Sequence, residues 1–114
     1  MRLKLAALTA ALFAVGISTQ AAPELPVVTL TLKGHRFTPQ SVEVPAGQPI
    51  RIELINLDAA SEEFDSLDLQ IEKDVTPNGR VSFVVGPLTP GVYSFVGELH
   101  ADTANGAIKA IAAH

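Results

Sequence analysis

The sequence predicts an all-β domain built as an antiparallel sandwich. Apolar and polar residues alternate along residues 28–33, 50–54 and 80–85, as they do in strands that bury one face. Turn signals rich in Gly, Pro and Asn separate these three segments. No stretch of about a dozen residues shows the apolar spacing and the capping residues of a helix. Short strands divided by such turns are typical of a sandwich of two sheets.

Two further strands are expected toward the carboxyl end of the chain, at residues 92–96 and 107–112. Residues 56–66 and 97–106 lack regular alternation, so both are expected to be loops, the first with a short extended piece around Phe64. Loops at one end of a sandwich lie near each other even when they are far apart in sequence. These two segments are therefore the candidate location of a functional site.

The amino terminus has the layout of a secretory signal peptide. Arg2 and Lys4 precede an apolar run at residues 5–17, and small residues follow the run. The run is shorter than the roughly 20 residues of a bilayer-spanning helix, so a retained membrane anchor is the less favoured interpretation. Cleavage is expected after Ala21, with Ala22 as the alternative, and the mature protein is expected in the periplasm. The predicted organisation is a signal peptide over residues 1–21 and one domain over residues 22–114.

The mature domain is acidic. Two of the eight Lys and Arg residues lie in the predicted signal peptide, which leaves six against 12 Asp and Glu and a net charge of −6. Such a field attracts cations and repels phosphates, so no nucleic-acid partner is expected. The chain has no Cys, and it lacks the nucleophile, phosphate-loop and zinc-helix motifs of hydrolases. A binding function is therefore favoured over hydrolysis.

Three stretches together resemble the cupredoxin family. They are Phe-Thr-Pro followed by Val-Pro-Ala-Gly within residues 37–47, then Asn56 after a strand, then residues 87–95. Their order and spacing cover nearly the whole mature chain. The resemblance implies a Greek-key β-sandwich with a metal site at one pole.

The sequence departs from the cupredoxin pattern at the expected ligands. Gly97 stands three residues before His100, where the family has its cysteine, and the only methionine is Met1. A blue-copper centre depends on a short copper–thiolate bond, so ordinary blue-copper electron transfer is excluded. Where the family's first histidine would fall, the chain has Glu62 and Glu63. The resemblance therefore implies a site rebuilt with oxygen ligands.

The rebuilt pattern is similar to that of EfeO-type cupredoxin-like domains. This similarity rests on residues 34–37, 62–66 and 97–106. It implies that an iron or copper ion is the cofactor. It also implies that the protein takes part in bacterial iron uptake with an inner-membrane iron permease.

Carboxylate and imidazole ligands suit Fe, Mn, Zn and Cu(II), whereas Cu(I) prefers sulfur. In an extended segment Glu98 and His100 would project to one face, and Glu63 would share a face with Asp65. Glu63 is therefore favoured over its neighbour, and Glu63, Glu98 and His100 are expected to converge on one cation. The alternative for each acid is a solvated surface position, and for His35 a turn histidine. The full set of candidate metal ligands is His100, Glu98, Glu63, Glu62, Asp65 and His35.

The leading hypothesis is a periplasmic metal-binding protein that presents iron, or uses copper to oxidise it, for a membrane importer. One alternative is a metal-free β-sandwich that serves as an interaction module. Another is a ferroxidase that oxidises Fe(II) catalytically. Only the ferroxidase is an enzyme.

Overall fold

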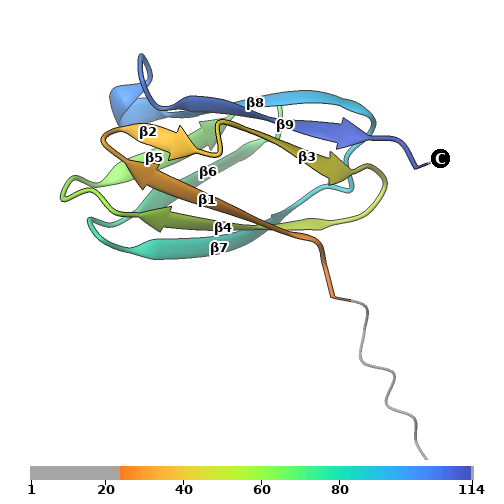
Figure 1. Ribbon diagram of the computed structural model, residues 1–114, viewed down its shortest axis with the longest axis horizontal. Helices are drawn as coiled ribbons and strands as arrows, with labels where there is room; N and C mark the ends of the chain where they lie inside the picture. Colours follow the sequence, from red (N-terminus) through yellow and green to blue (C-terminus); the bar gives the residue numbers. More distant parts are fainter. Residues whose placement is uncertain (1–23, 114) are drawn as a thin grey trace, which may run out of the picture.

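The computed structural model describes residues 24–113, which form a nearly all-β domain (Figure 1). The predicted signal peptide, residues 1–21, and the expected start of the domain at Ala22 lie outside the described residues. Within the described range no helix is long and apolar enough to cross a membrane. The elements are β1 (Val27–Lys33), β2 (Arg36–Thr38), β3 (Ser41–Pro45), β4 (Ile50–Asn56), β5 (Glu62–Ser66), β6 (Ile71–Val75), β7 (Arg80–Val85), β8 (Gly91–Gly97), the 3₁₀ turn η1 (Glu98–His100) and β9 (Asn105–Ile111).

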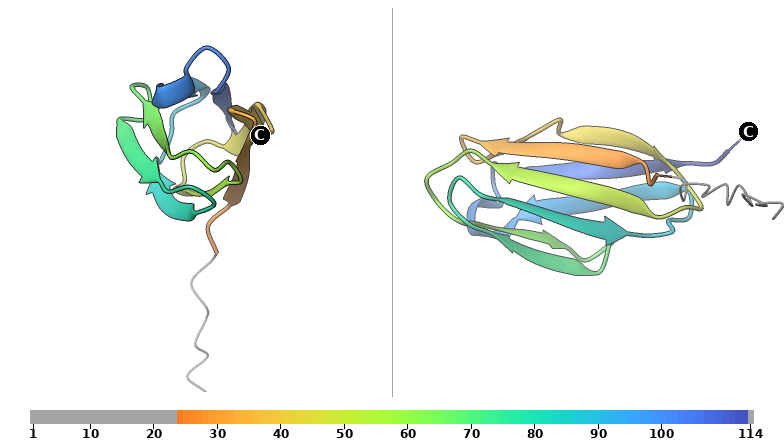
Figure 2. Two further views of the ribbon diagram at one scale, coloured as in Figure 1. Left: turned by 90° about the vertical axis from the view of Figure 1, so that its left-hand side faces the viewer. Right: turned by 90° about the horizontal axis from the view of Figure 1, so that it is seen from below.

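The strands form two sheets that pack face to face (Figure 2). One sheet has the strand order β2-β1-β4-β7, and the other has the order β3-β9-β8-β5-β6. The all-β sandwich predicted from the sequence is confirmed. The expectation of purely antiparallel pairing is wrong, because β1 pairs with β4 and β3 pairs with β9 in parallel. Alternation of apolar residues reports which face of a strand is buried and carries no information on strand direction.

Aromatic rings fill the part of the core that lies next to β5. Phe64 is fully buried, and its ring centroid lies 5.0 Å from that of Phe95 and 5.2 Å from that of Phe83. Phe37 meets the ring of Phe95 edge-on, with centroids 5.1 Å apart. Such pairs contribute roughly 0.5–1.5 kcal/mol each beyond their buried area. The aromatic cluster therefore packs β5 against its neighbour β8 and against the opposite sheet.

Residues 56–66 were expected to be a loop with a short extended piece around Phe64, and the structure confirms the extended piece but makes it a paired strand. Residues 62–66 form the regular strand β5, which pairs with β6 and β8. Its burial alternates, with Glu62, Phe64 and Ser66 inside and Glu63 and Asp65 on the outer side. Two of the three buried positions are polar, so the apolar alternation that reveals a strand is hidden in the sequence.

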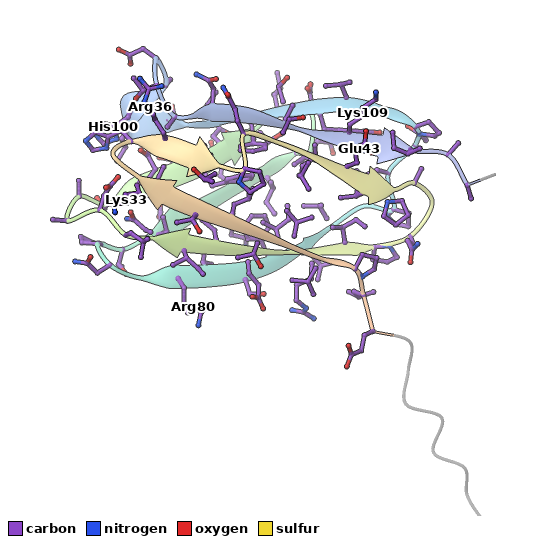
Figure 3. All side chains as sticks on the ribbon, in the orientation of Figure 1. Lys33, Arg36, Glu43, Arg80, His100 and Lys109 are labelled. Carbon is purple, nitrogen blue, oxygen red and sulfur yellow. The ribbon has the colours of Figure 1, made fainter. Side chains whose placement is uncertain are left out.

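Three segments meet at one end of the sandwich, on the left in Figure 1: the turn between β1 and β2, the loop between β4 and β5, and η1. Figure 3 places His100 at this end, beside Lys33 and Arg36. We call this end the η1 pole. The two segments that the sequence analysis selected for a functional site, residues 56–66 and 97–106, both reach it.

Candidate metal centre

The loop between β4 and β5 is held by a buried asparagine. Asn56 is fully buried at the end of β4, and its side-chain Nδ2 donates to the carbonyl oxygens of Ala60 at 2.8 Å and Thr76 at 3.1 Å. Its Oδ1 accepts from the amide of Asp58 at 3.0 Å. Both N–H groups and the oxygen of this side-chain amide thus bond to backbone groups. Asn56 therefore fixes the path of the chain from β4 into β5.

His35 enters the η1 pole from a tight turn. β1 and β2 pair up to Lys33 and Arg36, so Gly34 and His35 alone form the connection. Both have positive φ angles, 60° and 56°. Two central residues with positive φ define the type I′ hairpin turn, in which Gly and Asn are preferred. His35 is thus a non-glycine residue in a left-handed conformation, which costs of the order of 1 kcal/mol and tends to mark functional positions.

Glu62 supplies a buried carboxylate. It is only 2% exposed, and its Oε1 accepts from the amides of Glu63 at 3.0 Å and Leu99 at 2.9 Å. Its Oε2 lies 2.6 Å from Nδ1 of His100. Two atoms with lone pairs approach this closely only when a proton lies between them. Three hydrogen bonds from two segments, β5 and η1, thus fix the carboxylate.

Gly97 provides the space for this carboxylate. A Cβ atom at position 97 would lie 2.7 Å from Cδ of Glu62 and 2.8 Å from Cβ of Ala104, closer than real Cβ contacts allow. This is the position at which the cupredoxin resemblance implies a cysteine. The carboxylate of Glu62 therefore occupies the room that a side chain at position 97 would need.

Three donors converge at the η1 pole. His35, Glu62 and His100 each offer one ligand atom, and these atoms lie within 4.8 Å of one another. The side chains of His35 and His100 are 42% and 29% exposed, whereas that of Glu62 is 1% exposed. One buried anion and two accessible imidazoles form a donor set that suits Fe, Cu(II) and Zn. The residues present therefore fit a metal ion other than the blue-copper type.

The two imidazole rings are stacked. Their centroids are 3.6 Å apart and their planes differ by 12°. The lone pair of an imidazole nitrogen lies in the plane of its ring, so two nearly parallel rings cannot both direct one toward the same ion. His100 is held by Glu62, whereas the ring of His35 is the more exposed of the two. Binding through all three residues therefore requires the ring of His35 to turn.

The expected grouping of Glu63, Glu98 and His100 is not what the structure brings together. Residues 98–100 form a 3₁₀ turn and not an extended segment, so Glu98 and His100 do not share a face. His100 joins Glu62, the glutamate that was less favoured, because Glu62 and Phe64 share the buried face of β5.

The remaining candidates lie on the outer side of β5. Glu63 and Glu98 lie with Glu72 of β6 in a second group whose carboxylate oxygens are within 4.8 Å of one another. Asp65 is also on the outer side, and among the described residues it belongs to neither group of donors. We call Glu63, Glu72 and Glu98 the outer acidic group.

Like charges crowd in the outer acidic group. Burial raises the pKa of Glu63 above its ordinary 4.5, and the carboxylate of Glu98 raises it further. Glu72 and Asp74 add smaller effects in the same direction. The pKa of Glu63 is therefore shifted upward, opposite to the direction that an ion pair would give.

Replacing Glu63 with glutamine is expected to stabilise the metal-free protein at neutral pH. The raised pKa means that the folded state binds more protons than the unfolded chain, so stability falls as pH rises from 4.5 through the folded pKa. Glu63→Gln removes that loss. Thermal unfolding should show a higher midpoint for the variant at pH 7 and no difference below about pH 4. Glu43→Gln, beside Lys109 in the β3–β9 pair, is the control and should give no rise; equal midpoints for Glu63→Gln and wild type at pH 7 would contradict the prediction.

Two residues that contact the candidate ligands, Glu72 and Asp58, were not identified from the sequence. Glu72 lies in β6, diagonal to Glu63 across the β5–β6 pair, and it could have been found had residues 62–66 been recognised as half of a hairpin. Asp58 contacts the turn of His35, and its only signal is its place two residues after Asn56. The inward position of Glu62 does have a signal, since Phe64 two residues later is a core aromatic.

The sequence and the structure were compared with known proteins. Residues 5–110 match the family described as the cupredoxin-like domain. An uncharacterized protein of Rickettsia prowazekii, RP394, is 44% identical over 81 residues, which are 71% of this chain, and the chain spans 65% of that protein's length.

Two solved structures share the fold. A purple cupredoxin from Nitrosopumilus maritimus aligns with a TM-score of 0.59 and 17% identity, covering 74% of this chain and 99% of that one. The metal-binding domain of the Cu(I)-exporting ATPase CopA from Streptococcus pneumoniae aligns with a TM-score of 0.66 and 11% identity, covering 75% and 84%. Because the family match covers almost the whole chain and the fold is an all-β sandwich, the chain belongs to the cupredoxin-like domain family, although it has no cysteine.

Proposed function

We propose that the protein is a periplasmic metal-binding cupredoxin that holds an iron or copper ion through His35, Glu62 and His100 and takes part in iron uptake with an inner-membrane permease. One observation carries the proposal: a buried carboxylate and two imidazoles, drawn from three separate segments, bring their donor atoms within 4.8 Å of one another. Outside functional sites a carboxylate as buried as Glu62 is rare.

The donor set favours oxidised copper and iron over Cu(I). Two histidines and one carboxylate with open positions are the ligands of many non-haem Fe(II) sites, and imidazole also suits Cu(II). The chain has no Cys and its only Met is Met1, so the soft sulfur donors that Cu(I) prefers are lacking in the domain. When bound, such a metal supplies Lewis acidity or one-electron redox chemistry.

The charge around the η1 pole supports cation capture. Glu63 and Glu98 of the outer acidic group lie on the segments that supply Glu62 and His100, Glu72 lies on the adjacent strand β6, and the expected mature domain carries a net charge of −6. Acidic fields of this kind raise the local concentration of cations and accelerate their association.

Titration of the purified mature domain tests the binding step. Calorimetry with Fe(II), Fe(III), Cu(II), Zn(II) and Cu(I) should give saturable binding, with Cu(II) tightest among the divalent ions and Cu(I) weakest of all. The Cu(II) complex should show only a weak visible band, because no thiolate is present. Binding no tighter than about 1 mM, or about −4 kcal/mol, for every ion would end the proposal.

The role in uptake needs a test in cells, because the tightest ion in a titration is not always the physiological one. A deletion strain complemented with wild-type protein or with Glu62→Gln should differ in the uptake of radiolabelled iron. Full complementation by Glu62→Gln would instead support a metal-free interaction module. Catalytic oxidation of Fe(II) by the purified protein, lost in His100→Ala, would assign the protein as a ferroxidase. Fractionation of the same cells tests the periplasmic location.

A further inference from the structure

The two carboxylate oxygens of Asp58 make three contacts with the turn that carries His35. Its Oδ1 accepts from the amide of Gly34 at 2.7 Å, and its Oδ2 accepts from the amide of His35 at 2.9 Å. The same Oδ2 lies 3.5 Å from Nδ1 of the His35 ring. Asp58 and His35 are 23 residues apart in sequence. One carboxylate thus holds both residues of the type I′ turn and faces the imidazole ring.

The turn needs such support. Two consecutive N–H groups that point the same way in a left-handed turn form a small anion-binding concavity, and a carboxylate fills it well. His35 bears a side chain at a φ of 56°, where only glycine is free of steric cost. Hydrogen bonds from amides to an ionised carboxylate are stronger than those to a neutral acceptor, and two of them here offset that steric cost.

Asp58 is itself well anchored and ionised. Its amide donates to Oδ1 of the buried Asn56 at 3.0 Å, and its side chain is 14% exposed. The amide of His35, more than any other group, lowers the pKa of Asp58, and the amide of Gly34 lowers it further. The chain of contacts therefore runs from the buried asparagine through the loop carboxylate to the exposed histidine.

We propose that Asp58 is a positioning residue that acts through His35: it clamps the backbone of the Gly34–His35 turn and so keeps the imidazole at the η1 pole, where the ring stacks on His100 in the metal-free protein and can turn toward an ion held by Glu62 and His100. The effect on metal affinity rests on the proposed function. The effect on the position of the His35 ring in the metal-free protein does not depend on it. Removing the Asp58 carboxylate leaves the donors His35, Glu62 and His100 in place and removes only the support of His35. The loss of metal affinity should therefore be no larger than the loss caused by removing His35 itself.

The experiment compares Asp58→Ala, His35→Ala, the double variant and wild type, with Cu(II) alone as the probe and glycine as a competing ligand. Loss of a residue that orients a metal ligand typically lowers affinity about 10–100-fold. Asp58→Ala and His35→Ala should each fall in that range, and the double variant should bind no more weakly than His35→Ala. Asp58→Asn, which keeps one acceptor oxygen, should lie between wild type and Asp58→Ala.

A matched control is available in Asp68. Its Oδ2 accepts from the amide of Ser94 at 2.9 Å, so it is also an exposed-loop carboxylate that holds a distant backbone group. Asp68→Ala should lower thermal stability by an amount similar to Asp58→Ala while leaving Cu(II) affinity unchanged. Losses that multiply in the double variant, or wild-type affinity in Asp58→Ala, would overturn the inference.

Nuclear magnetic resonance of the metal-free protein separates this inference from the proposed function. Ring protons of the stacked His35 and His100 should be shifted upfield by each other's ring current. The shift should disappear in His35→Ala and Asp58→Ala and persist in Asp68→Ala. If wild-type protein bound no metal, the proposed function would fail while these spectra still decided the role of Asp58. Retention of the shift in Asp58→Ala would refute that role.

Discussion

Replacing Glu62 with glutamine is expected to lower the affinity for Cu(II) and Fe(II) about 100-fold, or about 2.8 kcal/mol, because the site loses its only buried anion. The substitution preserves size and keeps one carbonyl oxygen. That oxygen can still accept the amides of Glu63 and Leu99, which now bond to Oε1. The fold should therefore survive. Calorimetric titration and circular dichroism of the same samples measure both quantities.

Glu63→Gln is the matched control, because it changes the adjacent glutamate on the opposite face of β5. It should reduce Cu(II) affinity less than about threefold, since it removes one charge from the surrounding field and no donor from the His35–Glu62–His100 group. Equal losses for the two variants would show that general acidity, and not the buried carboxylate, governs binding. Retention of full affinity by Glu62→Gln would remove Glu62 from the site.

Gly97→Ala is expected to destabilise the protein by about 1–3 kcal/mol and to weaken metal binding at the same time. The backbone of Gly97 has a φ of −87°, which alanine adopts without strain, so the effect is steric. The added methyl group would press on the carboxylate of Glu62 and on the side chain of Ala104. Because the glutamate is the more flexible neighbour, it should move away from His100. Chemical denaturation and Cu(II) titration report the two effects.

A double-mutant cycle tests that explanation. Gly97→Ala should cost less stability in a Glu62→Ala background, where the crowded carboxylate is gone, than in wild type. Some of the stability cost of Gly97→Ala should remain in that background, because Cβ of Ala104 still lies 2.8 Å from the added atom. Strictly additive losses would mean that the carboxylate does not fill the space beside Gly97.

The sequence predicts most of the strands because their alternation is unbroken. It shows only a short extended piece around Phe64 where the strand β5 lies, since Glu62 and Ser66 are polar residues at buried positions. A strand with polar residues on its inner face is expected at a functional site, where local rules are broken for a chemical purpose. The weak strand signal of β5 and the presence of a candidate site there thus have the same cause.

The sequence also supplies the right residues but not their grouping. His35, Glu62 and His100 are all candidates from sequence, yet the favoured trio placed Glu63 and Glu98 with His100. That trio assumed an extended chain from Gly97 onward. In a 3₁₀ turn each side chain is rotated by about 120° from the one before, so residues two apart do not share a face as they do in a strand. Three residues are too few for a periodicity in the sequence to reveal such a turn. The reason for a glycine at position 97 likewise becomes clear only when the carboxylate of Glu62 is seen beside it.

The stacked imidazoles set how readily an ion would exchange. Turning the ring of His35 out of the stack costs about 1 kcal/mol, which weakens binding about fivefold relative to a ring already aimed at the ion. The same contact would draw the ring back when the ion leaves. Exposed side chains rotate within nanoseconds, so this step adds little delay. A site of this kind would hold an ion less tightly than one whose two imidazoles already point at it, which accords with the proposed role in uptake.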